Sequence, residues 1–290
     1  MPTALHPDRF ARALAPALRQ AVAIADALEG SVANRPKRGE ATPVKAALTI
    51  ADTASQEALL VALLEHYPNV RLEAEEDTPT VRRFPTESPS LVVIDPIDGT
   101  LRFYLEGLGP YAVMLGLARD GEYQAALVAM PRERLYFAAT RGNGATLASG
   151  DASAREVRPE ATGNRVFVNH DLPEAACASL RAGGFEVVPA AGGAISVAPL
   201  VPGVRAGLRW VRESAAGVSI RGRIGVLIAE EAGALVRCET GDRFPRGLDT
   251  PASALLVAAN PADLAALQDA LAAADGASRP VRGPNQPELD

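Results

Sequence analysis

Apolar residues recur at helical spacing in the first part of the chain. Residues 8–29 place apolar side chains on one helical face, and Pro16 is expected to kink this helix or to begin a second one. Residues 53–67 predict another helix, with Asp52 near its start. The segment between them, 45–52, predicts a short strand or a turn.

Strand patterns dominate the middle of the chain. Residues 69–74 predict a short β-segment, and the four apolar residues 91–94 predict a buried strand. Residues 111–140 contain alternating runs that are broken by Asp120 and Gly121 and by Pro131, as in an antiparallel meander. The first half of the chain therefore predicts an α+β fold.

The second half alternates strand-like and helix-like segments, which predicts an α/β fold. Strands are expected at 165–169, 185–190, 206–210 and 254–259, and helices at 172–183, 222–233 and 261–274. A turn-rich polar segment, 141–164, separates the two halves. We expect an N-terminal α+β domain at 1–150, a C-terminal α/β domain at 151–275 and a disordered tail at 276–290.

Composition and charge narrow the class of protein. A chain of 290 residues with 48% hydrophobic content can bury a large core. The net charge of −6 argues against binding to nucleic acid polymers or anionic membranes, because the summed field repels phosphate groups. Cys177 and Cys238 are too few for a disulfide framework and lack the spacing of a zinc site. With no secretory signal and no run long enough to cross a bilayer, the sequence predicts a cytoplasmic protein.

Two acids, Asp95 and Asp98, directly follow the predicted buried strand at 91–94. Pro96 fixes one backbone angle between them, and the turn is expected to aim both carboxylates into one cavity. Two like charges held close together imply a hard divalent cation or a functional acid. Glu75, which follows another strand, could complete the cluster, and a ligand set of oxygens alone favours magnesium over zinc.

The Gly99–Thr100 step after these acids offers backbone N–H groups to an anion. If a short helix begins there, the positive end of its dipole points toward the ligand of the metal. Phosphate is the anion that such a helix N-terminus commonly binds. The hydroxyl of Thr100 could orient a water for attack on phosphorus, while two metals about 4 Å apart would stabilise the attacking and leaving oxygens. The Asp-x-x-Asp spacing differs from the Asp-x-Asp of phosphatases that use an aspartyl nucleophile. The pattern therefore predicts hydrolysis without a covalent intermediate.

These residues carry a family resemblance. The segment "IDPIDGTLRF", with "EAEED" and "LTIAD" before it and "ARDGEYQAALVAMPRERLYFAATRGNGA" after it, resembles the inositol monophosphatase-like family of magnesium-dependent, lithium-sensitive phosphatases. The resemblance covers roughly residues 40–147 and resumes more weakly over "RIGVLIAEEAGALV". It implies a layered α-β-α-β-α sandwich of the inositol monophosphatase and fructose-1,6-bisphosphatase type, usually dimeric.

The resemblance also implies roles for single residues. Glu75, Asp95 and the carbonyl of Ile97 would hold a first Mg²⁺, and Asp95 and Asp98 would share a second. Thr100 would orient the attacking water, and Asp52 would hydrogen-bond that threonine or its water. The amides of Gly99 and Thr100 would bind the phosphate, and Glu213 weakly matches a position that touches sugar hydroxyls.

Arg221 is the clearest departure from the family pattern. Counting back from Glu231, Arg221 occupies the place of an aspartate that binds the second metal in the family. Arg221 could replace the second metal by pairing with Asp95 or Asp98 and contacting the phosphate, or it could close the site of a non-catalytic protein. A third possibility is that Glu213 or Glu230 supplies the missing carboxylate.

The sequence thus predicts a Mg²⁺-dependent phosphomonoesterase with an altered second metal site, acting on a small phosphorylated metabolite. The alternative is a pseudophosphatase that binds such a metabolite without hydrolysing it. Inositol phosphate, adenosine bisphosphate, fructose bisphosphate and histidinol phosphate all stay open as substrates. Glu76 and Asp77 are expected to face solvent, and the basic segment 35–40 to be a solvated loop rather than a guide for a phosphorylated substrate. Arg209 and Trp210 end a predicted strand near where the family places substrate-contacting residues, but packing is the favoured role for both.

Overall fold

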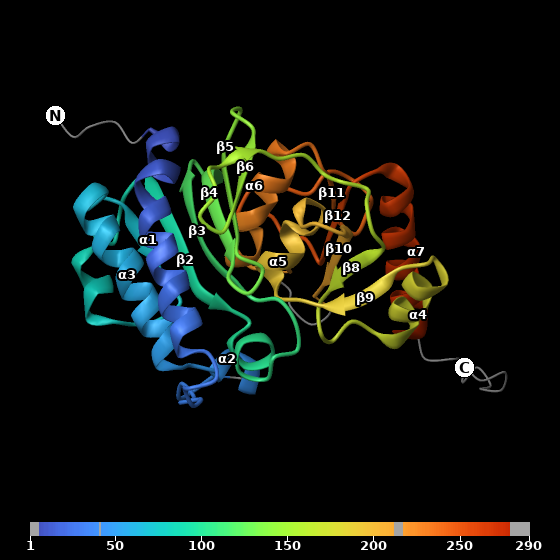
Figure 1. The fold of residues 1–290 in the computed structure, drawn as a ribbon, viewed down its shortest axis with the longest axis horizontal. Helices are drawn as coiled ribbons and strands as arrows, with labels where there is room; N and C mark the ends of the chain where they lie inside the picture. Colours follow the sequence, from blue (N-terminus) through green and yellow to red (C-terminus); the bar gives the residue numbers. More distant parts are fainter. Residues whose placement is uncertain (1–5, 41, 212–216, 279–290) are drawn as a thin grey trace, which may run out of the picture.

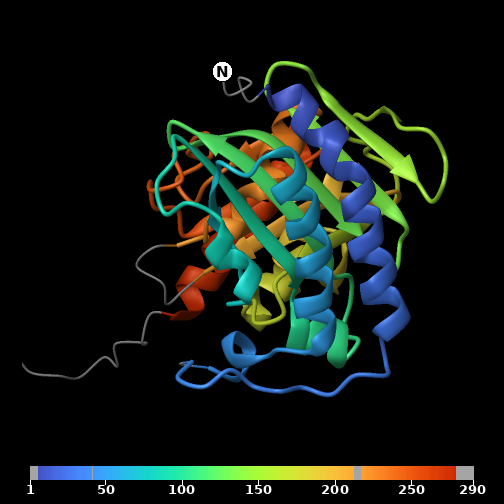
Figure 2. The same ribbon diagram turned by 90° about the vertical axis from the view of Figure 1, so that its left-hand side faces the viewer.

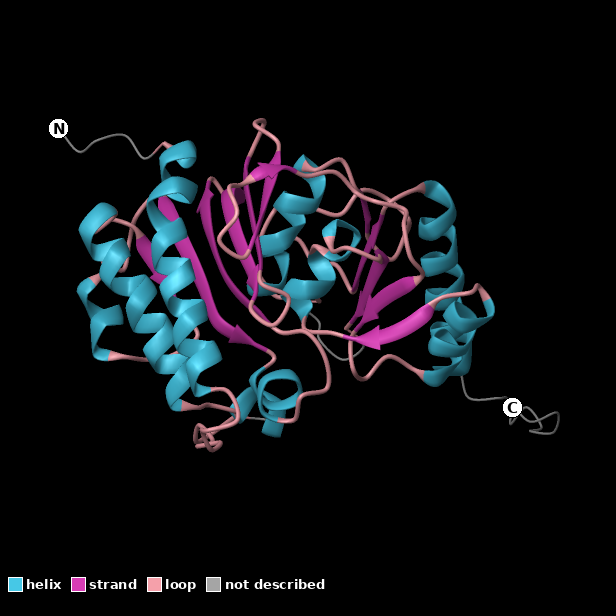
Figure 3. Cartoon of the chain, in the orientation of Figure 1, coloured by secondary structure: helices cyan, strands magenta, loops and turns pink. Residues whose placement is uncertain are grey.

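The chain folds into five alternating layers of helices and sheets (Figures 1 and 3). The computed structural model describes residues 6–40, 42–211 and 217–278. The first layer consists of α1 (Pro7–Leu28) and α3 (Ile50–His66), which lie side by side across one face of the first sheet (Figure 2). α1 is a single helix with Pro16 inside it, so no second helix begins there.

The first sheet has seven strands, and their order in space follows their order in the chain. They are β1 (Arg71–Glu73), β2 (Ser90–Asp98), β3 (Ala112–Arg119), β4 (Glu122–Met130), β5 (Leu135–Thr140), β6 (Ala145–Ser149) and β7 (Arg155–Glu156). β1 pairs with β2 in parallel, and all later pairs are antiparallel. The meander predicted over 111–140 is confirmed. The prediction missed β6 and β7, because their small and polar residues resemble a loop.

The second sheet has the order β11-β12-β10-β8-β9. Its strands are β8 (Arg165–Val168), β9 (Glu186–Pro189), β10 (Val204–Trp210), β11 (Leu235–Arg237) and β12 (Ala254–Ala258). α5 (Gly192–Ser196) and α6 (Ile224–Glu231) lie between the two sheets, and α4 (Glu174–Ala182) and α7 (Pro261–Ser278) cover the outer face (Figure 1). The strands and helices expected in the second half are confirmed, and so is the layered α-β-α-β-α architecture.

Short helical segments complete the chain: α2 (Pro43–Ala46), Pro79–Arg83, Thr100–Leu105, Ala198–Leu200 and Arg221–Arg223. The strand considered for 45–52 does not form, because Thr49 caps α3 by accepting hydrogen bonds from the amides of Ala51 and Asp52. The division into domains at residue 150 stays a prediction. Of the expected tail, residues 279–290 lie outside the described residues, and α7 continues to Ser278.

Successive residues of β2 belong alternately to two hydrophobic clusters on opposite faces of the first sheet. Val92 and Ile94 pack with α1 and α3, whereas Val93 belongs to the cluster between the two sheets, which also contains residues of α5 and α6. Successive side chains of a strand point to opposite faces, so Asp95 shares the inner face with Val93. The period-2 pattern therefore directs Asp95 toward the second half of the chain. None of the described helices combines the length and apolar character needed to cross a membrane.

Candidate active site

The acid turn lies at the end of β2, which lies between the edge strand β1 and β3 in the first sheet. Asp95 pairs in register with Met114 of β3, while Asp98 pairs with Ala112, so three residues of β2 span two of β3. This register shift is a β-bulge, and Pro96 within it could not donate a ladder hydrogen bond in any case. The bulge turns Asp98 toward the inner face that Asp95 already occupies.

Asp98 is held by the first turn of α5. Its Oδ2 accepts a hydrogen bond of 2.5 Å from the amide of Gly193. A Cβ at Gly193 would lie 2.8 Å from Cβ of Ala112, 2.9 Å from Sδ of Met114 and 3.2 Å from Oδ2 of Asp98. Only glycine lets the backbone of α5 approach the acid turn this closely.

Asp95 is a buried carboxylate whose charge is only partly compensated. Its side chain lies next to Glu75. Burial raises the pKa of Asp95 well above its ordinary value, and the negative charges of Glu75 and Asp98 raise it further. Its Oδ1 is buried and accepts no hydrogen bond within the described residues. A buried oxygen without a partner destabilises the folded protein. A bound cation, a hydrogen-bond donor or a proton on this oxygen would remove that destabilisation.

Thr100 and Asp52 form the second part of the site. The Thr100 hydroxyl donates to Oδ1 of Asp52 at 2.8 Å and also contacts the carbonyl oxygen of Ile97 at 3.0 Å. The other oxygen of Asp52 accepts from the amide and the hydroxyl of Thr49, both at 2.7 Å. Gly99 precedes this helical turn with a φ of 92°, which favours glycine. The hydrogen bond predicted between Asp52 and Thr100 is therefore present.

Lys37 joins the acid cluster from the loop after α1. Its Nζ lies 3.5 Å from Oε1 of Glu75 and 2.8 Å from Oε1 of Glu76. The expectation that segment 35–40 is only a solvated loop is therefore wrong for Lys37. Because its partners come from a segment 38 residues later in the chain, a local charge pattern could not reveal this contact.

Glu76 is 4% exposed, which corrects the expectation that it faces solvent. Gln56 holds its backbone in place, donating to the Glu76 carbonyl at 2.7 Å and accepting from the Glu76 amide at 3.0 Å. Burial raises the pKa of Glu76 from 4.5 to about 7, against the opposing effect of Lys37. Asp77, by contrast, is exposed as expected.

Arg209 reaches the acids from β10 of the second sheet, although the sequence favours a packing role for it. A Cβ at Gly192 would lie 2.0 Å from its Nη1, and a Cβ at Gly222 would lie 2.3 Å from the same atom. The guanidinium therefore passes between two glycine backbones. Burial raises the pKa of Asp98, and the nearby charge of Arg209 opposes that rise most strongly. The signal in the sequence was the position of Arg209 at the end of a predicted strand, near where the family resemblance places substrate-contacting residues.

Arg221 also faces the acid cluster. Its Nε lies 3.9 Å from Oδ2 of Asp95, and its Nη1 lies 3.9 Å from Oε1 of Glu73. Both separations exceed a hydrogen bond, so Arg221 contributes a charge beside Asp95 rather than a fixed contact. This placement matches the idea that Arg221 pairs with one of the acids.

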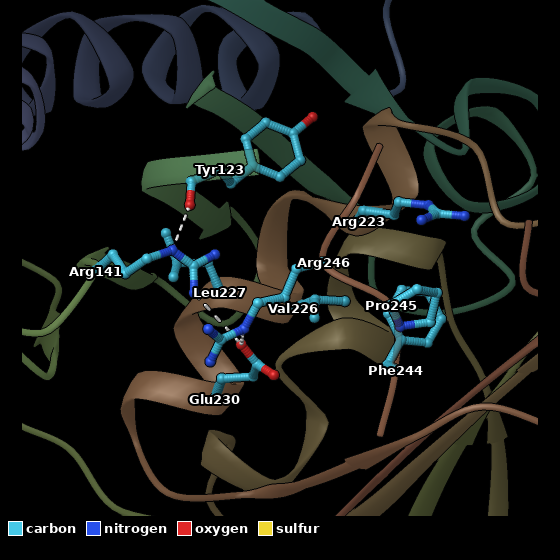
Figure 4. A pocket seen from close by; sticks show the side chains of 9 residues that line it. All are labelled: Tyr123, Arg141, Arg223, Val226, Leu227, Glu230, Phe244, Pro245 and Arg246. Carbon is cyan, nitrogen blue, oxygen red and sulfur yellow. Dashed lines mark hydrogen bonds and ion pairs between the residues drawn. The ribbon is translucent and has the colours of Figure 1, made fainter. Parts of the chain in front are cut away.

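Glu230 does not supply the missing carboxylate. It lies on α6 and pairs with Arg243 at 2.9 Å, Arg246 at 3.3 Å and Arg141 at 3.8 Å. Figure 4 shows Glu230 directed toward Arg246 and Arg141 within a small pocket that is lined by none of the other predicted site residues. The proposal that Glu230 replaces the family's aspartate is therefore wrong, and Glu213 lies outside the described residues.

The residues fit one divalent cation better than two. Glu75 and the unpartnered Oδ1 of Asp95 are oxygen donors suited to Mg²⁺. At the second position, Asp98 already binds the Gly193 amide and faces Arg209, and Arg221 lies beside Asp95. In the part of the chain that the structure describes, no three acidic, histidine or cysteine side chains already form a metal cage.

Comparisons with known proteins agree with this fold. The chain matches "Thermotoga maritima IMPase" with a TM-score of 0.68 at 16% identity, covering 93% of this chain and 97% of the other. It matches the "IMPase/NADP phosphatase complexed with Mg2+ and phosphate" with a TM-score of 0.67 at 17% identity, covering 90% and 94%. At these identities the structural matches show the fold alone.

A sequence relative is the Nus factor SuhB of Pseudomonas aeruginosa, which is 32% identical over 100 residues, 34% of this chain and 36% of the relative. The chain thus spans well under half of the length of such curated relatives. The model of the inositol monophosphatase family matches residues 9–181, which include Asp52, Asp95 and Thr100 but not Arg209. Because this match covers more than half of the 290 residues, the chain belongs to the inositol monophosphatase family.

Proposed function

We propose that the protein hydrolyses a small phosphomonoester with the help of one divalent cation, Mg²⁺. The observation that carries this proposal is the buried Asp95 beside Glu75, with one oxygen lacking any hydrogen-bond partner in the described residues. Family membership supports a phosphatase-type function, and a structural neighbour was crystallised with Mg²⁺ and phosphate. Unpaired buried carboxylate oxygen is costly, and a bound cation would remove that cost.

Glu75, Asp95 and the carbonyl of Ile97 would hold the cation. A bound Mg²⁺ would neutralise charge on the phosphate and the acids, so that a nucleophile can approach phosphorus. Ile97 is fully buried, and its carbonyl oxygen, which lies 3.0 Å from the Thr100 hydroxyl, keeps a lone pair for a ligand. Gly99 and Thr100 would offer their backbone amides to the phosphate oxygens.

Thr100 would orient the attacking water. Its hydroxyl proton points to Asp52 or to the Ile97 carbonyl, so its lone pairs are free to accept a hydrogen bond from a water. Asp52 is fully buried and, chiefly for that reason, its pKa is raised. A carboxylate of raised pKa next to this threonine is suited to receive a proton from the water through Thr100.

Arg221 would take over part of the role of a second metal ion. It places a permanent charge beside Asp95, where the family resemblance implies an anionic ligand. A guanidinium can bind phosphate oxygens but cannot activate a water as a metal does, so turnover should be slower than with two metals. The predicted homodimer, and the contact between Glu213 and a substrate hydroxyl, remain part of this proposal.

A pseudophosphatase is the second candidate, and the positions of two cations favour it. Lys37 contacts Glu75, and Arg221 lies beside Asp95, so the two proposed ion ligands each have a cationic neighbour. If these side chains replace the metal, the protein would bind a phosphorylated metabolite and release no phosphate.

Phosphate release separates the two candidates. We would assay inositol 1-phosphate, adenosine 3′,5′-bisphosphate, fructose 1,6-bisphosphate and histidinol phosphate with Mg²⁺, comparing the wild type with Asp95→Asn. The exposed neighbour substitution Asp77→Asn serves as a control. We expect Mg²⁺-dependent release that Asp95→Asn abolishes and Asp77→Asn preserves. Release that survives Asp95→Asn would refute the proposed site, whereas binding without release by the wild type would favour the pseudophosphatase.

A further inference from the structure

The turn that carries Arg221 is fixed through its backbone. The Arg221 side chain is 31% exposed and stays 3.9 Å from each of its two acidic neighbours, so neither of these ion pairs fixes the guanidinium closely. The residue before it is held more firmly. The carbonyl oxygen of Ile220 accepts a hydrogen bond of 2.8 Å from the Tyr123 hydroxyl and one of 3.1 Å from the Arg223 amide. Both lone pairs of this carbonyl are therefore in use.

Tyr123 reaches Ile220 from the first sheet. It lies near the start of β4, is only 3% exposed, and precedes Ile220 by 97 residues. A Cβ at Gly116 of β3 would lie 2.5 Å from Cε1 and 2.8 Å from Cδ1 of the ring, so a glycine there leaves the ring its place. Arg141 fixes the backbone, because its Nε donates to the Tyr123 carbonyl at 2.9 Å (Figure 4). Tyr123 is thus held at its backbone, its ring and its hydroxyl.

Arg223 holds the same turn from the other side. It is 3% exposed, and its guanidinium donates to three carbonyl groups of the second half of the chain: Val218 at 2.9 Å, Gly247 at 2.8 Å and Thr250 at 2.6 Å. Arg223 therefore connects the turn to the second half, whereas Tyr123 connects it to the sheet that carries Asp95. The Tyr123 hydrogen bond is the contact that spans from the Arg221 turn to that sheet.

We propose that Tyr123 is a positioning residue for Arg221, and that its hydrogen bond to Ile220 sets the place of the Arg221 guanidinium relative to Asp95 and the bound phosphate. This inference rests on the proposed function, in which Arg221 binds phosphate oxygens in place of a second metal ion. Burial raises the pKa of Tyr123 well above its ordinary value, so its hydroxyl keeps its proton and donates. Because Tyr123 acts through Arg221, its loss matters for phosphate binding only while Arg221 is present.

A double-mutant cycle on phosphate affinity tests this dependence. Isothermal titration calorimetry with inorganic phosphate and Mg²⁺ would measure Kd for the wild type, Tyr123→Phe, Arg221→Gln and the double variant. Tyr123→Phe removes only the hydroxyl and should raise Kd about 3- to 10-fold, which is within the usual coupling between neighbouring residues. In the Arg221→Gln background the same change should have no further effect. Tyr136→Phe removes a tyrosine hydroxyl from β5, beneath Arg19, and should leave Kd unchanged.

A second measurement follows the turn itself. Hydrogen–deuterium exchange of the amides of Gly222 and Arg223 should become at least about twofold faster in Tyr123→Phe, because the turn loses its link to the first sheet. The variant keeps its ring against Gly116, and thermal unfolding would show that it is folded. Unchanged exchange in folded Tyr123→Phe would overturn the inference, since the turn would then not depend on the hydroxyl.

The outcomes separate this inference from the proposed function. An equal rise of Kd in both backgrounds would mean that Tyr123 serves the fold in general, and no rise in the wild-type background would mean that it does not position Arg221; either result overturns the inference. Phosphate release that needs Asp95, without coupling between Tyr123 and Arg221, would support the proposed hydrolysis and refute the positioning role. Coupling in the binding cycle, without phosphate release from any substrate, would support the positioning role and refute the proposed hydrolysis.

Discussion

Thr100 donates a hydrogen bond of 2.8 Å to Asp52, which lies 48 residues earlier and on a different element. The carboxylate belongs to the first turn of α3, where it also caps the helix through Thr49. The hydroxyl belongs to the turn after the acid strand. The Asp52 carboxylate thus connects the start of α3 to Thr100, the residue proposed to orient the attacking water. A change at either residue should therefore affect both stability and activity.

Replacing Thr100 tests this connection. Thr100→Val keeps the shape of the side chain but leaves Oδ1 of Asp52 without its donor, so we expect a loss of about 1–3 kcal/mol in unfolding free energy. Phosphate release should fall by roughly 100-fold or more, in line with the usual contribution of acid–base groups. Thr100→Ser keeps the hydroxyl and should restore most of both. Urea denaturation and a phosphate-release assay measure the two effects, and a Val variant with wild-type turnover would exclude Thr100 from the reaction.

Replacing Arg221 tests the altered second metal site. Arg221→Asp exchanges a cation for an anionic ligand, so we expect a second Mg²⁺ to bind and kcat to rise. The matched control Arg221→Gln removes the charge without adding a ligand and should give no such gain. Metal titration and initial rates measure both. If Arg221→Asp folds but binds no second Mg²⁺ and shows no rise in kcat, Arg221 is not the residue that prevents binding of a second metal ion.

Glu76 predicts a pH dependence of stability in the metal-free protein. Its pKa is raised from 4.5 to about 7 in the folded state. Between these values the folded protein holds a proton that the unfolded chain has lost, so this contribution to stability is present at low pH and lost as the pH rises through about 7. The size of the effect is at most about 3 kcal/mol.

The measurement is the unfolding free energy from pH 4 to pH 8 in EDTA. Glu76→Gln should make this curve flatter, while Asp77→Asn, at an exposed neighbouring position, should leave its slope unchanged. The carboxylates with raised pKa at Asp52, Asp95 and Asp98 act in the same direction, so the difference between wild type and Glu76→Gln isolates Glu76. An identical slope in the two proteins would contradict the assignment.

Gly193 predicts a strict steric requirement. Gly193→Ala would press a Cβ against Ala112, Met114 and Asp98, so we expect a destabilisation of about 1–3 kcal/mol and displacement of α5 from the acid turn. Gly183→Ala is the control, because a Cβ there meets nothing closer than 3.4 Å and its φ is −76°. Thermal unfolding of both variants checks this, and wild-type stability and activity in Gly193→Ala would show that α5 is not held closely against Asp98.

The acid turn was predictable from the sequence because its chemistry is local. Asp95 and Asp98 follow a run of apolar residues, and the spacing to Gly99 and Thr100 identifies the turn. The position of Asp52 at the start of α3 followed from helix capping signals. The α+β and α/β halves were also predictable, because the alternating patterns of the first half and the strand–helix alternation of the second half are strong periodic signals. The layered architecture came from the family resemblance.

The contacts of Arg209, Lys37 and Glu76 at the acid cluster were not predictable, whereas Arg221 was expected beside the acids from the family resemblance. Arg209, Lys37 and Glu76 reach their places through packing between segments far apart in the chain, and periodicity contains no information about such contacts. The sequence favours a packing role for Arg209 and a solvated loop around Lys37. Glu76 is buried because Gln56, 20 residues earlier, holds its backbone. Only the three-dimensional arrangement shows that Arg209 and Lys37 join Arg221 near the acids.

The number of divalent ions bound per chain tests the account most directly. Mn²⁺ is a suitable probe, and equilibrium dialysis or electron paramagnetic resonance would count the bound ions in the presence of inorganic phosphate. The account predicts one ion per wild-type chain, lost in Asp95→Asn. Two ions bound by the wild type would contradict the proposal that Arg221 takes over the role of a second metal ion, and no bound ion would contradict the proposed metal-dependent hydrolysis.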